Sequence, residues 1–334
     1  MTQRINRNKA KPRKKAFNIN FNNKDNVMII GADSFIGSPM IEAITLSNKN
    51  AIPIPSSKDK PDYENIFSKQ KKKIDSIIYI DGKSSYKGET IADTLMTYRQ
   101  KNCYQALDLI KIANKNNVRR FIYLSSAKIQ KRIESIHPNE ALSQITNNLD
   151  AYLFSKYEAE IKLTIFAQNN NIELTIIRAP LIYGPNVKGN FLALMNLIYK
   201  GFPLPFGSLK NKVSLIFVKN LCDAFIKANN KPEASGKIFT VADKKPIRVS
   251  YLIKYLIKSL NSSSILLPVP KFILTIIAKI SDNEAKAKKL TDKFIINHEQ
   301  IYDDLGWEPP FSVFEGLEET SKWYKEKIKS KLAK

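Results

Sequence analysis

The stretch Val27–Met40, VMIIGADSFIGSPM, carries the strongest structural signal in this chain. Its first four residues form a short and wholly apolar run, which is typical of a buried parallel strand. Gly31 and Gly37 follow, six residues apart, and after the second glycine the apolar residues take a helical spacing. The order of strand, glycine-containing turn and helix predicts a βα unit. Its turn would direct backbone N–H groups and the positive end of the helix at an anion such as a pyrophosphate.

This turn departs at one position from the usual nucleotide-binding pattern. Ser34 stands in the middle, where most such turns have a glycine and where backbone and phosphate come closest. A serine still presents its backbone N–H, and we expect its hydroxyl to replace a water molecule on the phosphate. Nucleotide binding should therefore be retained. Because two glycines in a loop are also ordinary turn residues, the turn alone leaves both interpretations open.

Strand and helix signals alternate along the first half of the chain. Apolar runs typical of strands lie at 74–82, 119–126 and 172–180, and helical patterns lie between them at 96–117 and 150–170. This alternation predicts an α/β fold of the Rossmann type, a doubly wound parallel sheet.

The same pattern suggests a division of the chain. Residues 1–25 are interpreted as a disordered basic tail, and residues 26–180 as a dinucleotide-binding Rossmann domain. Proline-bearing loops interrupt the pattern in 181–330, which we interpret as mainly a smaller C-terminal substrate-binding region, with possible return strands to the sheet. Since ligands of open α/β sheets bind at the carboxyl ends of the strands, we expect this region to lie over that edge.

The net charge of +23 raises the question of a nucleic-acid partner. Seven basic residues fall within the first sixteen positions, and the others are scattered through predicted helices and loops. No nucleic-acid-binding motif accompanies them. We interpret them as a solvated basic surface that attracts phosphate-bearing ligands, and we expect no dedicated nucleic-acid binding.

Several classes of protein have little support in the composition. Cys103 and Cys222 have no CxxC partner, which argues against a disulfide framework and a zinc site. His137 and His298 are the only histidines, so we expect no metal and no Ser-His-Asp triad. No run approaches the roughly 20 apolar residues of a spanning helix, and the basic N-terminus lacks the apolar core of a signal peptide. A cytoplasmic location is therefore expected.

Ser126, Tyr152 and Lys156 form the candidate catalytic group. Tyr152 and Lys156 are four residues apart in a predicted helix, so their side chains are neighbours on one face. A nearby ammonium lowers the pKa of a phenol from about 10 toward the working range, which suits an acid and base for a sugar hydroxyl or a ketone. Ser126 ends the preceding predicted strand and can hydrogen-bond the same oxygen. The pair alone is common in core helices, but its combination with the turn and the serine favours a catalytic site.

On these stretches the chain resembles the extended short-chain dehydrogenases/reductases, in the NAD-dependent epimerase/dehydratase family that acts on nucleotide sugars. The resemblance runs from about Val27 to Lys325 and rests on GADSFIG, VRRFIYLSSAKI, DAYLFSKYEAE, IIRAPLIYGPNVKGNF and LGWEPPFSVFEGLEETSKWY. Residues 178–221 are most similar to the branch that contains UDP-4-keto-6-deoxy-N-acetylglucosamine C4-reductases and UDP-sugar 4-epimerases of bacterial surface-polysaccharide pathways.

The resemblance implies roles for the catalytic group and the turn. Tyr152 would be the proton donor and acceptor at O4 of the sugar, Lys156 would lower its pKa and hold the nicotinamide ribose, and Ser126 would orient the sugar oxygen. The cofactor pyrophosphate would be wrapped by Gly31, Ser34, Phe35, Ile36 and Gly37.

On the substrate side, the resemblance implies a UDP-sugar and two binding residues. Asn190 would approach the nucleotide diphosphate, and Lys212 is a candidate substitute for an arginine that commonly grips it. The resemblance also implies a homodimer built from the helix that bears Tyr152 and its neighbour.

The end of the predicted second strand bears on the choice of cofactor. NAD-selective folds usually have Asp or Glu there for the ribose 2′-OH, whereas this chain offers Ser56, Ser57 and Lys58. Because hydroxyls and a cation suit a 2′-phosphate, the sequence favours NADP(H) over NAD(H). Asp81 stands where the family usually has a small residue beside the adenosine, and the sequence predicts no role for it.

These features favour C4 reduction of a UDP-4-keto-6-deoxy-HexNAc. A UDP-glucose or UDP-N-acetylglucosamine 4-epimerase is the alternative, because it uses the same three residues. Dehydration is disfavoured, since Ala127 and Lys128 follow Ser126 where family dehydratases have Asp-Glu. A non-catalytic nucleotide-binding or RNA-associated Rossmann protein is a second alternative, and the intact catalytic group argues against it.

The segment Ser264–Ile280 is strongly apolar but contains two prolines and two lysines. We interpret it as a buried helix in preference to a membrane-surface contact, and a weak membrane-surface association stays open.

Overall fold

The structure, a computed structural model, describes residues 25–56, 61–86, 88–133, 148–270, 273 and 293–332. The predicted basic tail lies outside these residues except for Asp25, and so do Ser57 and Lys58. The apolar segment that starts at Ser264 is described only as far as Pro270 and at Ile273.

A six-stranded sheet in the order β2-β1-β3-β4-β5-β9 forms the centre of the molecule, and every neighbouring pair of strands is parallel. Its strands are β1 (Asn26–Ile30), β2 (Asn50–Ile54), β3 (Ser76–Tyr79), β4 (Arg120–Ser126), β5 (Glu173–Ala179) and β9 (Ile238–Thr240). The strand order reverses between β1 and β3, which makes the carboxyl ends of these two strands the expected ligand crevice. The predicted α/β class with a parallel sheet is confirmed, and β9 shows that the chain beyond Pro180 also supplies a strand.

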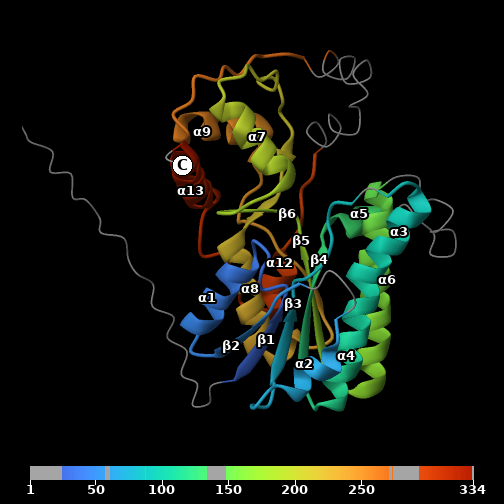
Figure 1. The fold of residues 1–334 in the computed structure, drawn as a ribbon. Helices are drawn as coiled ribbons and strands as arrows, with labels where there is room; N and C mark the ends of the chain where they lie inside the picture. Colours follow the sequence, from blue (N-terminus) through green and yellow to red (C-terminus); the bar gives the residue numbers. More distant parts are fainter. Residues whose placement is uncertain are drawn as a thin grey trace, which may run out of the picture.

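Helices cover both faces of the sheet, as Figure 1 shows. On one face lie α1 (Gly37–Leu46) and α8 (Val218–Asn230), and on the other lie α4 (Gln105–Lys115) and α6 (Asn148–Asn170). The strands β1, β3 and β4 have apolar centres and are almost entirely buried, because each of their faces packs under a helical layer. Two hydrophobic clusters, one on each side of the sheet, form the core.

The helix predicted at 96–117 is interrupted. It begins earlier as α3 (Ile91–Arg99), where Thr90 and Asp93 form a capping box, and passes through a π-helical turn (Gln100–Tyr104) into α4. The extra residue of the π turn places Asn102 in the interior, where it is fully buried. Apolar periodicity is almost the same on both sides of such a turn, so the sequence pattern did not reveal it.

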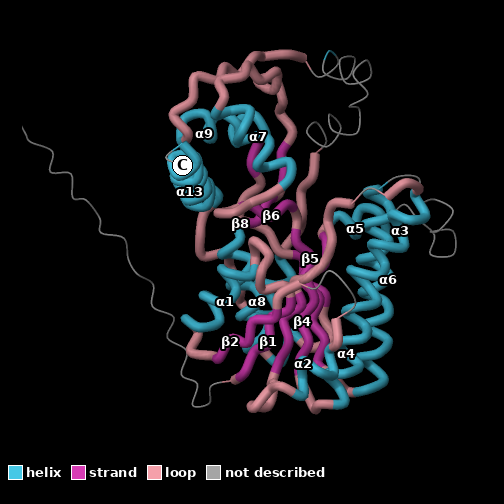
Figure 2. Tube along the Cα trace, viewed as in Figure 1, coloured by secondary structure: helices cyan, strands magenta, loops and turns pink. Residues whose placement is uncertain are grey.

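A smaller region stands above the carboxyl edge of the sheet in Figures 1 and 2. Its helices are α7 (Gly189–Tyr199), α9 (Val249–Ser259) and α13 (Val313–Leu332). It also contains two short strand pairs, β6 (Leu181–Tyr183) with β8 (Leu215–Phe217), and β7 (Lys212–Val213) with β10 (Ile247–Arg248). The remaining described helices are α2 (Tyr63–Ser68), α5 (Lys128–Ile133), a 3-10 turn (Pro232–Ala234) and α12 (Glu299–Leu305).

Asp243 ties this region to the sheet. Its carboxylate accepts hydrogen bonds from the Tyr183 hydroxyl (2.8 Å), the Phe217 backbone N–H (2.9 Å) and the Asn220 side-chain amide (2.7 Å). Burial raises the pKa of Asp243 above its ordinary value, and these three donors counteract part of that effect. In the part of the chain that the structure describes, no helix is long and apolar enough to cross a membrane.

Candidate active site

The turn after β1 is closed by two glycines that tolerate no side chain. Gly31 has a φ of +91°, and a Cβ there would lie 2.8 Å from the backbone nitrogen of Asp81. A Cβ on Gly37 would lie 2.1 Å from the carbonyl oxygen of Ala32, so the start of α1 packs directly on the turn. These two positions do what the spacing predicted for them: one bends the chain and the other allows close packing.

Ser34 also has a structural role inside the turn. Its hydroxyl accepts a hydrogen bond from the backbone N–H of Gly37 (3.2 Å), and its own N–H donates to the carbonyl of Gly31 (3.0 Å). Because the hydroxyl only accepts in this contact, its proton can still be donated to a phosphate, and the predicted contact stays a prediction.

Two backbone donors of this turn are left without a protein acceptor. Among the residues that the structure describes, the N–H groups of Phe35 and Ile36 make no hydrogen bond. They precede the first residue of α1, where the positive end of the helix dipole adds to their field. Donors without acceptors at a helix N-terminus beside a tight glycine turn fit a diphosphate.

The ends of β2 and β3 meet beside this turn. The Asp33 carboxylate accepts the backbone N–H of Ser56 (2.7 Å), and the Ser56 hydroxyl donates to Oδ1 of Asp81 (2.9 Å). Oδ1 of Asp81 also accepts the backbone N–H of Gly82 (2.8 Å). Asp81 thus gains partners that the sequence did not predict. Asp33, in the third position of the turn, was not singled out, and only the approach of β2 to the turn reveals its contact.

The three predicted catalytic residues come together at the carboxyl end of β4. Ser126 is the last residue of this strand, and its side chain is close enough to the phenol of Tyr152 on α6 to lower the pKa of that phenol. Lys156 lies one turn further along α6, where its Nζ donates to the carbonyl of Leu124 (3.0 Å) and stands 4.6 Å from the ring centre of Tyr123. The Tyr152 phenol and the Lys156 ammonium of α6 therefore both lie at the carboxyl end of the sheet.

The electrostatics of this group differ from the prediction. Burial raises the pKa of Tyr152 to about 12, and the nearby Ser126 side chain counteracts only part of that effect. The expectation that Lys156 lowers the phenol pKa is therefore wrong for the protein by itself. Burial lowers the pKa of Lys156 to about 8, and the carboxylate of Asp81 counteracts part of this shift.

Asn102 supports the catalytic helix from the π turn. Its amide nitrogen donates to the Ser155 hydroxyl (3.0 Å) and to the carbonyl of Lys83 (3.1 Å), and its oxygen accepts the Lys83 N–H (2.8 Å). Gly82 lies between this amide and the catalytic lysine, since a Cβ there would be 2.8 Å from Asn102 Oδ1 and 3.1 Å from Lys156 Nζ. Sequence reasoning missed Asn102, because a lone asparagine inside a helical pattern carries no signal.

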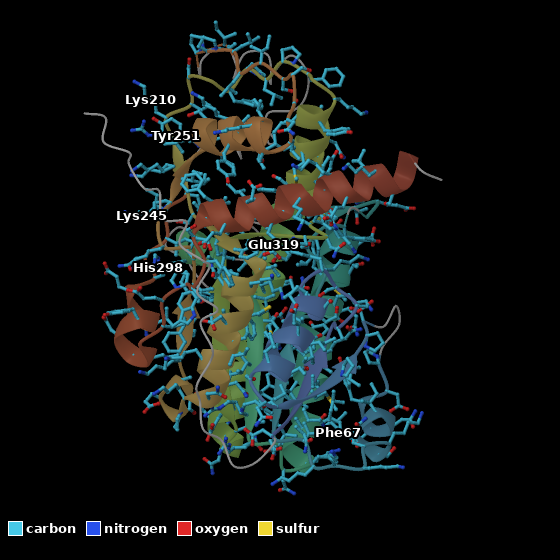
Figure 3. The ribbon with its side chains drawn as sticks, turned by 90° about the vertical axis from the view of Figure 1, so that its left-hand side faces the viewer. Phe67, Lys210, Lys245, Tyr251, His298 and Glu319 are labelled. Carbon is cyan, nitrogen blue, oxygen red and sulfur yellow. The ribbon has the colours of Figure 1, made fainter. Side chains whose placement is uncertain are left out.

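The two predicted substrate residues lie in the smaller region. Asn190 is the second residue of α7, Lys212 is in β7, and both side chains are exposed. Neither makes a hydrogen bond with the catalytic residues. Lys212 pairs in register with Arg248 of β10, whose guanidinium lies 5.4 Å from the ring centre of Tyr251. Figure 3 shows Tyr251 on the same side of the smaller region as Lys210 and Lys245, far from Phe67 at the other end of the molecule.

Within the described residues, no group of His, Cys, Asp and Glu is arranged to hold a metal ion. The site consists of the glycine turn after β1 and of a group at the end of β4. This group is formed by the Ser126 hydroxyl, the Tyr152 phenol and the buried Lys156 ammonium. Together they define a dinucleotide-binding enzyme fold with a Ser-Tyr-Lys group. Residues 27–242 match the model of the NAD dependent epimerase/dehydratase family. The chain belongs to this family.

Several proteins resemble most of the chain. It is 28% identical over 317 residues to a UDP-glucose 4-epimerase of Vibrio cholerae, a match that covers 88% of this chain and 94% of the relative. It is 24% identical over 324 residues to N-acetyl-alpha-D-glucosaminyl-diphospho-ditrans,octacis-undecaprenol 4-epimerase of Escherichia coli O157:H7, covering 89% and 94%. The solved UDP-glucose 4-epimerase of Thermotoga maritima shares the fold, with a TM-score of 0.69, 19% identity and coverage of 91% and 99%.

Proposed function

We propose that this chain is a UDP-sugar 4-epimerase that works with a retained NAD. The observation that carries the proposal is the convergence of Ser126 at the end of β4 with Tyr152 and Lys156 of α6, where Lys156 Nζ donates to the carbonyl of Leu124 in the same strand. The turn after β1 presents the free N–H groups of Phe35 and Ile36. The resemblance of most of the chain to two 4-epimerases supports epimerisation over net reduction.

In the proposed reaction, a bound NAD supplies a hydride acceptor and donor for C4 of the sugar. Tyr152 takes the proton from the C4 hydroxyl as the 4-keto sugar forms and returns it to O4 when the opposite epimer forms. Ser126 hydrogen-bonds the same oxygen and holds it beside the phenol. Lys156 holds the nicotinamide ribose, and its charge stabilises the tyrosinate that exists between the two proton transfers.

The raised pKa of Tyr152 fits the acid half of this cycle, because the phenol keeps its proton throughout the physiological range. The base half needs extra positive charge near the phenol. The Lys156 ammonium is in place for it, and the positively charged nicotinamide of NAD adds to it when bound.

Substrate binding is assigned to the smaller region. Asn190 and Lys212 are exposed there and are proposed to contact the UDP diphosphate. Arg248, the register partner of Lys212, adds a second cation on the adjacent strand. A homodimer through α6 and its neighbouring helix is part of the proposal.

C4 reduction of a UDP-4-keto-6-deoxy-HexNAc is the second candidate. It uses the same Ser126, Tyr152 and Lys156, and the resemblance of residues 178–221 to the reductase branch supports it. The two reactions differ in whether the reduced cofactor is consumed.

The test is a turnover assay on the purified chain. UDP-glucose and UDP-N-acetylglucosamine are supplied without reductant, UDP-4-keto-6-deoxy-N-acetylglucosamine is supplied with NADH or NADPH, and products are identified by NMR. We expect interconversion of the 4-hydroxy epimers without net cofactor loss. Stoichiometric oxidation of NADH or NADPH would establish the reductase instead.

A matched pair of variants completes this test. Tyr152→Phe should reduce turnover by about 10² to 10⁴-fold, because it removes only the acid and base. Tyr157→Phe, on the same helix, should retain native turnover. If neither reaction occurs while a dinucleotide is bound, the non-catalytic alternative replaces the proposal.

A further inference from the structure

The contacts around Ser56 carry an inference about cofactor selection. In nucleotide-binding folds of this type, an acid at the end of the second strand usually binds the ribose 2′-OH of NAD. Here β2 ends at Ile54, and the serine Ser56 follows it where an acid is usual. Two carboxylates from other parts of the fold accept hydrogen bonds from Ser56.

The first carboxylate comes from the glycine turn. Oδ1 of Asp33 accepts the Ser56 N–H at 2.7 Å, which fixes the backbone after β2 against the turn. This hydrogen bond is the main reason that the pKa of Asp33 is lowered, so the group is ionised at neutral pH. The residue is exposed, and its second oxygen remains available to a ligand.

The second carboxylate comes from the loop after β3. Oδ1 of Asp81 accepts the Ser56 hydroxyl at 2.9 Å and the Gly82 N–H at 2.8 Å. The serine hydroxyl is therefore already donating its proton and cannot donate it to a phosphate. Asp81 also lies against the bend at Gly31, so it borders the same crevice as the phosphate-binding turn.

We propose that Asp33 and Asp81, bridged by Ser56, replace the missing acid at the end of β2 and select NAD(H) over NADP(H). Their unused oxygens accept the hydroxyls of the adenosine ribose. A 2′-phosphate would meet two carboxylates at close range, which is unfavourable by charge repulsion. This inference opposes the preference for NADP(H) that Ser56, Ser57 and Lys58 suggested from the sequence, and it refines the proposed function at its cofactor.

Two cations have to be weighed against the carboxylates. Lys188 is close enough to Asp33 to lower the pKa of its carboxyl slightly, and it is exposed at the start of α7. Lys58 lies outside the described residues. Either lysine would be the natural partner of a 2′-phosphate, so both belong in the test.

The experiment measures the binding of NAD⁺ and NADP⁺ to the full chain by calorimetry, after removal of any retained cofactor, and identifies by mass spectrometry the dinucleotide that the protein carries when purified. The native chain should carry NAD and bind NAD⁺ at least about tenfold more tightly than NADP⁺, a difference of about 1.4 kcal/mol. Asp33→Asn and Asp81→Asn each keep the oxygen that accepts the hydrogen bonds of Ser56 and remove only the charge.

The double variant Asp33→Asn/Asp81→Asn should bring the two dissociation constants to within about threefold of each other, because removing both charges removes the repulsion. Lys188→Ala and Lys58→Ala should leave the preference for NAD⁺ unchanged. A native preference for NADP⁺ would overturn the proposal, as would a double variant whose preference does not move. These binding results do not depend on turnover, so an inactive chain that prefers NAD⁺ would refute the proposed epimerase and leave this inference standing.

Discussion

The cofactor side and the substrate side of this protein are built in different ways. Around the turn after β1, polar groups are hydrogen-bonded to one another. Asp33 and Asp81 accept hydrogen bonds from Ser56, and the Ser34 hydroxyl accepts one from Gly37 within the turn. On the smaller region, Asn190, Lys212 and Arg248 project as exposed groups on short elements. The comparison indicates that the side chains around the proposed cofactor pocket are held in place by one another, whereas the proposed substrate contacts are solvated in the protein by itself.

The catalytic lysine offers the strongest test of a prearranged site. Lys156→Met should lower turnover by about 10² to 10⁴-fold, because it removes the charge that stabilises the tyrosinate. Lys162→Met, at a partly exposed position on the same helix, is the matched control and should keep native turnover. Equal losses in both variants would show that the effect comes from the helix and not from the charge.

The same substitution should change how the stability of the protein depends on pH. Lys156 is buried with its pKa lowered from 10.5 to about 8, so the folded protein releases this proton more readily than the unfolded chain. The native protein should therefore gain up to about 1.4 kcal/mol per pH unit between pH 8 and 10.5 relative to Lys156→Met. Urea unfolding of both proteins at pH 7 and 9.5 measures this, and a constant difference would contradict it. Native activity should fall above pH 8 as the ammonium is lost.

The contact between the smaller region and the sheet depends on Asp243. Asp243→Ala leaves the donors of Tyr183, Phe217 and Asn220 without their acceptor, which should cost about 2 to 4 kcal/mol of unfolding free energy. Asp243→Asn keeps one acceptor oxygen and should cost less than half as much. Denaturant titration separates the two variants. Equal losses of unfolding free energy in the two variants would mean that the charge of Asp243, and not its acceptor oxygens, stabilises this contact.

A smaller effect is expected on the substrate side. Lys212→Ala should raise the KM for the UDP-sugar about five- to tenfold with kcat unchanged, because a solvated contact to a diphosphate contributes binding in ground and transition state alike. Lys210→Ala, two residues away and also exposed, should leave KM near its native value. A fall in kcat would place Lys212 nearer to the chemistry than proposed.

The smallest effect is expected at the N-terminus. Deletion of residues 1–24 should leave kcat and KM unchanged, because an enzyme of this kind binds its ligands at the sheet edge. Electrophoretic mobility shifts with RNA across a salt series test the alternative role of the basic tail. Loss of a salt-dependent RNA affinity together with an absence of turnover would favour the RNA-associated alternative.

Much of the architecture follows from local sequence patterns. Val27–Ile30 and Phe121–Leu124 are continuous apolar runs because both faces of a parallel sheet are covered, and Gly31 and Gly37 mark a turn that only glycine can make. The order of the turn, Ser126 and the Tyr152–Lys156 pair identified the class of enzyme. These signals are short in sequence, and each depends on neighbours within a few residues.

Other properties could not be predicted in this way. The π turn that buries Asn102 leaves the apolar period nearly intact, and the hydroxyl of Ser34 is used inside its own turn. The direction of the Tyr152 pKa shift was predicted wrongly, because spacing along a helix shows that an ammonium is near but not how much solvent the phenol loses.

The sequence by itself determined the parallel α/β fold, the position of the phosphate-binding turn and the three residues that meet at the end of β4, because these depend on periodicity and spacing along single elements. Only the tertiary structure decided that Asp33 and Asp81 converge on Ser56, and that burial moves the pKa values of Tyr152 and Lys156. The physical reason is that desolvation and contacts between carboxylates and hydroxyls depend on which strand ends lie side by side, a property of the folded sheet that no local stretch contains.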